Sequence, residues 1–132
     1  FVIDLSSDDI YQNNNKLVNQ GAGLFGAAVL WDLKGNDTYT GFHISQGAGL
    51  FGIGMLIDEE GFDNYRGGYF TQGAGNFGAG ILLDFKQDDI YHSYSWAQGM
   101  GGVWAYGLLY DKDGDDLYYV GGKYLHLPLT PD

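Results

Sequence analysis

The segment Gln20–Gly26 (QGAGLFG) decides the fold, because it returns along the chain. It recurs as QGAGLFG at 46–52 and as QGAGNFG at 72–78, and in the looser form QGMG at 98–101. The interval is 26 residues each time, and residues 20–45 and 46–71 are identical at 13 of 26 positions without a gap. A fixed period of this length is the signature of a solenoid or a related repeat architecture.

A second motif lies inside each unit and reads Asp, four residues, Asp, one residue, Tyr. Its copies are Asp4/Asp9/Tyr11, Asp32/Asp37/Tyr39, Asp58/Asp63/Tyr65, Asp84/Asp89/Tyr91 and Asp111/Asp116/Tyr118. The last interval is 27 residues because one residue is inserted near Gly102–Trp104, and the first is 28, with extra residues at 13–15. Insertions of this kind are expected in loops.

The stretches between the motifs read as short strands. Gly26–Leu33, Gly52–Ile57 and Gly78–Leu83 are apolar runs too short for helices, whereas Thr38–Ser45 and Asn64–Thr71 alternate and carry aromatic residues. We therefore expect an all-β fold, a parallel β-solenoid (β-helix) of about five coils. An outer-membrane-type barrel built from 26-residue β-hairpins is the alternative, although a barrel gives no reason for near-identical residues at identical positions in successive hairpins.

The chain is expected to form a single repeat domain over 1–132 that is a fragment of a longer solenoid. Its expected parts are a partial coil (1–19), repeats at 20–45, 46–71, 72–97 and 98–124, and a tail (125–132).

Stacking the coils at about 4.8 Å predicts columns of equivalent side chains. Three of these columns are expected to lie inside: Phe25, Phe51 and Phe77; Leu30, Leu56, Leu82 and Leu109; and Ile44, Phe70 and Trp96. The glutamines that open each QGAG segment (Gln20, Gln46, Gln72 and Gln98) are expected to form an amide ladder between coils.

The acidic residues are concentrated in the second motif. The chain carries a net charge of −11 and no cysteine, and sixteen of its seventeen acidic residues fall between the first Asp and the Tyr of a motif copy. Stacked carboxylates repel one another unless they are neutralised, and oxygen ligands favour Ca²⁺. The candidate ligands are Asp32, Asp37, Asp58, Asp63, Asp84, Asp89, Asp111 and Asp116. A purely structural role, as turn formers along a solvated acidic edge, is the alternative.

Two resemblances support a secreted repeat protein. Gly35–Tyr39 (GNDTY) and Gly114–Tyr118 (GDDLY) resemble part of the RTX, or haemolysin-type, calcium repeats, although the unit here is 26 residues instead of nine. The whole unit is similar to Gln-Gly-x-Gly…Gly-Asp-Asp-x-Tyr repeats of uncharacterised, secreted-looking bacterial proteins. These resemblances imply an extracellular or cell-surface scaffold and name no activity.

Repetition also argues against catalysis, because the carboxylate pair recurs in every unit whereas an active site breaks a repeat at one place. We expect a non-catalytic scaffold or filament that associates end to end. The alternative is a carbohydrate-binding module that stacks sugars on a Tyr/Trp stripe including Tyr39, Tyr65, Tyr91 and Tyr118. The acidic balance disfavours nucleic acid, and no apolar run is long enough for membrane insertion as a helix.

Overall fold

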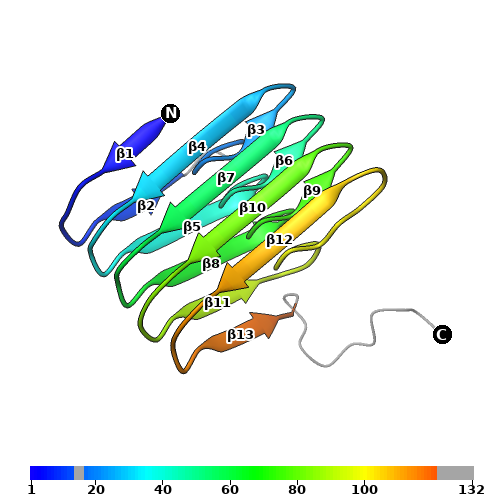
Figure 1. The fold of residues 1–132 in the computed structure, drawn as a ribbon. Helices are drawn as coiled ribbons and strands as arrows, with labels where there is room; N and C mark the ends of the chain where they lie inside the picture. The colour runs from blue at the N-terminus through cyan, green and yellow to red at the C-terminus, as the bar shows by residue number, and fades with distance from the viewer. Residues whose placement is uncertain (14–16, 122–132) are drawn as a thin grey trace.

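The computed structural model describes residues 1–13 and 17–121, which form thirteen strands in three parallel sheets and no helix. The strands wind into a β-solenoid of about four turns, close to the expected five (Figure 1). Every strand pair in this part of the chain is parallel, so the antiparallel barrel hairpins are wrong. None of the described segments is a helix with the length and apolarity that a bilayer crossing requires.

Successive turns place their strands in the same sheets, with five strands in each of the two wide sheets and three in the narrow one (Figure 1). The first sheet, called sheet A below, has the order β1 (Val2–Asp4), β4 (Ala27–Asp32), β7 (Ile53–Asp58), β10 (Ala79–Asp84) and β12 (Tyr106–Asp111). Sheet B contains β2 (Ile10–Gln12), β5 (Thr38–His43), β8 (Asn64–Tyr69), β11 (Ile90–Ser93) and β13 (Leu117–Val120). A narrow third sheet is built from β3 (Gly23–Leu24), β6 (Gly49–Leu50) and β9 (Gly75–Asn76).

The register follows the sequence repeat. Leu30 pairs with Leu56, Leu56 with Leu82, and Leu82 with Leu109 across the insertion. The extra residue lies in the loop between β11 and β12, where the main-chain N–H of Val103 donates to Asn76 Oδ1 of the preceding coil at 3.0 Å. The predicted strands and loop insertion are therefore confirmed there, whereas most of the first insertion lies outside the described residues.

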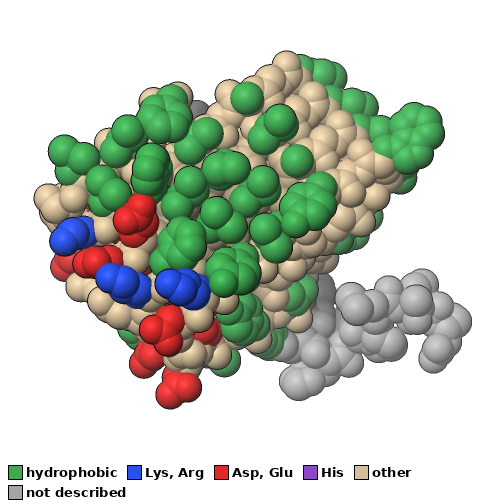
Figure 2. Space-filling model, viewed as in Figure 1, with side chains coloured by type: hydrophobic (Ala, Val, Ile, Leu, Met, Phe, Trp, Pro, Cys, Tyr) green, Lys and Arg blue, Asp and Glu red, His purple; other side chains and the backbone are tan. Residues whose placement is uncertain are grey.

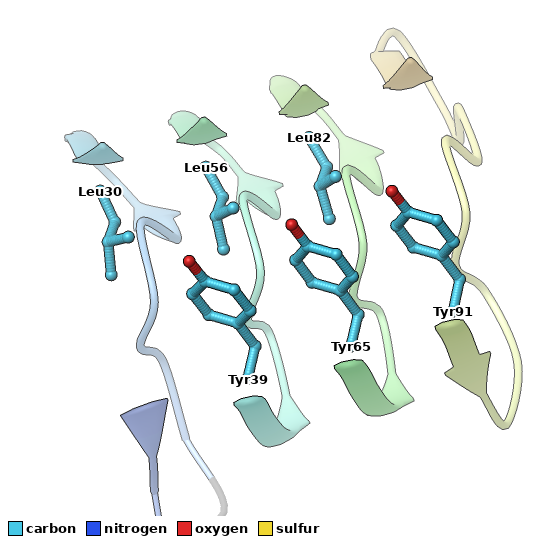
Figure 3. Close-up of a cluster of buried hydrophobic side chains, with 6 residues drawn as sticks. All are labelled: Leu30, Tyr39, Leu56, Tyr65, Leu82 and Tyr91. Carbon is cyan, nitrogen blue, oxygen red and sulfur yellow. The ribbon is translucent and has the colours of Figure 1, made fainter. Parts of the chain in front are cut away.

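The interior is a thin double column (Figure 3). Leu30, Leu56 and Leu82 from sheet A face the rings of Tyr39, Tyr65 and Tyr91 from sheet B, and all six are buried. Successive Tyr rings are stacked with centroids 4.8 Å apart and nearly parallel planes. The predicted leucine column is thus confirmed, with Leu109 partly buried at its end.

The coil is thin because glycines let the backbone of the third sheet lie directly under sheet A. A Cβ on Gly54 or Gly80 would collide with the main-chain carbonyl of Ala48 or Ala74, respectively. No side chain fits at these inward positions, so the sheets approach closely and the alanines complete a second small core with Phe70.

The predicted internal phenylalanine column is wrong. Phe25, Phe51 and Phe77 stack on one another, but they lie on the outside and are 75%, 48% and 39% exposed. Each has a positive φ of 50–54°, and this left-handed backbone breaks the strand alternation and turns the ring outward. The third predicted column is only partly internal, because Phe70 is buried whereas Trp96 is 66% exposed.

The glutamines stack, but they do not form an amide-to-amide ladder. Gln46 Nε2 donates to the carbonyls of Tyr39 (2.9 Å) and Arg66 (3.0 Å), and Gln72 repeats the pattern with Tyr65 and His92. Each amide therefore bridges the main chains of two successive sheet B strands, and ties adjacent coils together at a left-handed corner residue.

Candidate metal centre

Two columns of aspartates line the turn that joins sheet A to sheet B. The strand-end aspartates close each sheet A strand and are Asp4, Asp32, Asp58, Asp84 and Asp111. The turn aspartates precede each sheet B strand and are Asp9, Asp37, Asp63, Asp89 and Asp116. In the inner coils both columns are buried, with exposed fractions of 0–1%. The expected solvated acidic edge is therefore wrong for these residues, because the repeating carboxylates point into the solenoid.

The turn aspartates hold the coils together through the main chain. The N–H of Asp37 donates to Asp63 Oδ1 at 2.6 Å, and the N–H of Asp63 donates to Asp89 Oδ1 at 2.6 Å. The same bond joins Asp9 to Asp37 and Asp89 to Asp116. Each of these carboxylates thus satisfies a main-chain donor of the preceding coil with one oxygen.

The strand-end aspartates accept from the tyrosine column. The hydroxyl of Tyr39 donates to Asp58 Oδ2 in the next coil at 2.6 Å, and the hydroxyl of Tyr65 donates to Asp84 Oδ2 at 2.6 Å. Burial, followed by repulsion from Asp58 and Asp84, raises the pKa of Tyr65 well above its ordinary value. These tyrosines consequently stay protonated and act as fixed donors.

This arrangement corrects the glycan-binding candidates. Tyr39, Tyr65 and Tyr91 are 0% exposed, so their rings cannot stack on a sugar. Tyr118, in the last turn of the described chain, is 46% exposed and donates to Asp111 Oδ2 at 2.7 Å.

One oxygen remains without a hydrogen-bond partner on five of the six buried carboxylates and on Asp111, whereas Asp32 Oδ1 accepts from the N–H of Lys34 at 3.2 Å. These atoms are Asp37 Oδ2, Asp58 Oδ1, Asp63 Oδ2, Asp84 Oδ1, Asp89 Oδ2 and Asp111 Oδ1. A buried anion without a partner is costly. The column therefore needs a positive species between the two rows of aspartates, either a proton or a metal ion.

The aspartates of the two columns gather into groups that could hold a metal ion. Among the described residues, three groups have ligand oxygens within 4.8 Å of one another: Asp32/Asp37/Asp58, Asp63/Asp84/Asp89 and Asp89/Asp111/Asp116. Every predicted ligand belongs to at least one group, so the predicted residues are brought together as sets of three carboxylates.

The protein's own cations do not neutralise these groups. The two ion pairs formed by the described residues join Lys34 and Lys86 to the exposed Glu60, and they lie outside the buried columns. Burial instead raises the pKa of Asp37 to about 7, and it is also the largest cause that raises the pKa of Asp58, Asp63, Asp84 and Asp89. Without a metal ion, the column therefore retains protons near neutral pH.

The spacing within the second motif contains a signal for this burial. Asp37 and Tyr39 are two residues apart at the start of a strand, so they share one face. If the tyrosine is inward, the aspartate must be inward as well. The interaction that could not be anticipated is the bond between a Tyr hydroxyl and the Asp of the next coil, because it depends on the stacking geometry.

No protein-family model, curated protein or solved structure matches the chain. The function is therefore inferred from the geometry of the site and of the surfaces.

Proposed function

We propose that the protein is a non-catalytic structural repeat rod of the extracellular space or cell surface, and that calcium ions neutralise its buried aspartates. The observation that carries the proposal is the row of partnerless carboxylate oxygens, repeated at equivalent positions between coils. A ligand in such a position joins one coil to the next, so its chemical effect is to stabilise the stack.

The donor set favours calcium. Each group consists of carboxylates alone, without nitrogen or sulfur ligands, and such hard oxygen donors suit Ca²⁺ or Mg²⁺. Mg²⁺ demands a near-ideal octahedron and retains several waters, whereas Ca²⁺ accepts irregular geometry and bidentate carboxylates. Buried clusters with few positions open to water therefore suit Ca²⁺ better. The likeness of residues 35–39 to RTX corners supports the same ion.

End-to-end association is the proposed mode of assembly. In the described chain, β1 and β12 each pair on one side only in sheet A, and β2 and β13 do so in sheet B. An open parallel edge is a template for a further strand, so another coil with the same Asp and Tyr columns would continue the stack.

Thermal unfolding followed by far-UV circular dichroism tests the calcium proposal. Relative to metal-depleted buffer at pH 8, millimolar Ca²⁺ is expected to raise the Tm by roughly 10 °C or more, since a ligand that binds only the folded state stabilises it. Mg²⁺ at the same concentration should give a clearly smaller rise. An identical melt in EDTA and Ca²⁺ would overturn the calcium proposal and leave protons as the neutralising species.

Carbohydrate binding is the second candidate function, and its candidate site is the outer face of sheet B instead of the buried tyrosine column. A groove of about 480 Å³ lies there, with Arg66, His92, Phe42 and Tyr94 among its lining residues. The glycine at position 68 separates Phe42 and Tyr94, which occupy the corresponding positions of the flanking units, and the two rings meet edge to face across it at 6.2 Å. This is a place where successive units differ, and it combines aromatic rings with a cation.

Retention on immobilised polysaccharides tests the second candidate. Arg66→Ala combined with Tyr94→Ala should abolish retention if the groove binds sugars. The matched control is Ile57→Ala, which changes the outer face of the other sheet. Equal retention of both variants would exclude the groove.

A further inference from the structure

The outer face of sheet A is apolar at each outward position of its long strands. Two central rows cross the strands in register, Val29–Met55–Ile81 and Trp31–Ile57–Leu83, and both rows continue with apolar or aromatic residues on β12. All six central side chains are partly exposed. Figure 2 shows the result as a broad apolar field over the strands of this sheet.

The other sheet does not share this property. On sheet B the corresponding outward rows include Thr38 and Asn64, and Thr40 and Arg66. Both sheets share the same interior, so the repeat does not require an apolar exterior. The apolar character of sheet A is therefore a feature of that surface alone.

We propose that a second copy of the chain packs against this face, sheet to sheet. The rows of side chains on this face repeat at the spacing of parallel strands, about 4.8 Å. A second copy of the chain presents a surface with the same repeat, so the two surfaces can match over several strands. Two such sheets can interdigitate their side chains at about 10 Å, as the layers of a β-sandwich do. The central rows offer almost no hydrogen-bonding groups to a sugar, a peptide backbone or a nucleic acid.

Charge at the border favours one orientation of the two copies. Charged side chains border the apolar field in Figure 2. Glu60 follows the end of β7 and Lys86 follows the end of β10, and the two form an ion pair within one chain. A two-fold axis parallel to the strands and between β7 and β10 exchanges these two coils. It places Glu60 of each copy opposite Lys86 of the other, so the border is complementary to itself.

The size of the face sets the expected strength. Four strands of six residues span about 19 by 20 Å, so two copies would cover on the order of 800 Å² of flat area before the relief of the side chains is counted. This is in the range of weak, reversible interfaces. We therefore expect a closed dimer that dissociates on dilution through the micromolar range, in contrast to the open series of species that end-to-end growth produces.

Sedimentation velocity from about 5 to about 500 µM tests the proposal. The unaltered chain should form a face-to-face dimer as its concentration rises, whereas Met55→Lys with Ile81→Lys should lose this dimer and keep only the species that end-to-end association produces. The matched control, Thr38→Lys with Ile90→Lys on the outer face of sheet B, should dimerise like the unaltered chain. Circular dichroism verifies folding, and Met55→Thr with Ile81→Thr replaces the lysine pair if that variant does not fold.

Three results would overturn the inference. They are a monomer at every concentration, a closed dimer that persists in the folded Met55/Ile81 variant, and an open-ended series that the variant leaves unchanged. Flotation of a monomeric chain with neutral phosphatidylcholine vesicles would assign the apolar face to lipid instead.

Discussion

Tyr65 and Arg66 are consecutive residues of one strand, yet they follow opposite rules. Tyr65 points inward, is fully buried and has a Tyr in register in the coils on both sides. Arg66 points outward, and its neighbours in register are Thr40 and His92. An inward side chain must fit the identical ring 4.8 Å above and below it, whereas an outward one meets solvent. Inward positions therefore carry the same residue in successive coils, whereas outward positions can carry different residues.

The interior is unusual because its polar column is buried together with its apolar one. Leucine and tyrosine columns are stabilised simply by exclusion from water. The aspartate columns oppose that stability unless protons or cations occupy the space between them. The largest expected effect therefore concerns the aspartate columns, and it is a dependence of the free energy of unfolding on pH.

The metal-free protein should lose stability as the pH rises. Burial raises the pKa of Asp37 to about 7 in the folded state, so the folded chain holds protons that the unfolded chain releases. This stabilisation is complete below about pH 4, the ordinary pKa of Asp, and is lost as the pH rises through about 7. The shift at Asp37 alone should lower the free energy of unfolding by roughly 3 kcal/mol between pH 4.5 and 9, and the raised pKa values of the other buried aspartates should make the total fall larger.

Urea unfolding in metal-depleted buffers at a series of pH values measures this change. Repeating the series with Ca²⁺ is the control, and Ca²⁺ should remove most of the loss because metal ligands must be deprotonated. A metal-free stability that is constant or rises with pH would show that the carboxylates are not buried as described.

Removing one interior ring should have the next largest effect. Tyr65→Ala leaves a cavity in the column and deprives Asp84 of its 2.6 Å donor, so it should cost about 4 kcal/mol. The neighbouring Arg66→Ala should cost less than about 0.5 kcal/mol, since an exposed side chain is lost. Chemical denaturation of both variants provides the comparison. Similar losses of unfolding free energy would contradict the conclusion that inward residues are constrained by the coils on both sides and outward residues are not.

The repeat made the architecture predictable. Position-by-position identity fixed the strands and their register, as the pairing of Leu30 with Leu56 illustrates, and the extra residue near Val103 correctly marked a loop. Whether a side chain points inward or outward was harder to predict. At Phe51, a φ of +51° reverses the alternation of the strand, and the residue types of this segment do not indicate a left-handed conformation at that position. The burial of Asp58 was not predicted either, because a charged residue next to a turn is ordinarily expected in solvent.

Asp84→Asn should separate the charge of the column from its shape. The amide keeps the size of the carboxylate but removes a buried negative charge, so the metal-free protein at pH 8 should gain about 1–2 kcal/mol. The same change removes a ligand oxygen's charge from the group with Asp63 and Asp89, so the Ca²⁺-induced rise in Tm should shrink. Exposed Asp113→Asn is the matched control and should alter neither quantity. A variant that is less stable without metal and keeps the full Ca²⁺ effect would argue against this group as a cation site.

The smallest effect is expected at the outer corner, where the repeat keeps a residue without burying it. Phe51 stacks between Phe25 and Phe77 at 5.2 and 4.8 Å while holding a left-handed backbone. Phe51→Asn loses the ring contacts, each worth about 0.5–1.5 kcal/mol, but it gains a residue that tolerates this conformation, worth about 1–2 kcal/mol. The two terms nearly cancel, so the urea midpoint should hardly move.

In the same coil, inward Leu56→Asn should cost more than about 3 kcal/mol. A loss of that size at Phe51 would mean that the exposed aromatic ridge is packed against another molecule under the conditions of the measurement, and that this corner, like the interior, is constrained by its neighbours.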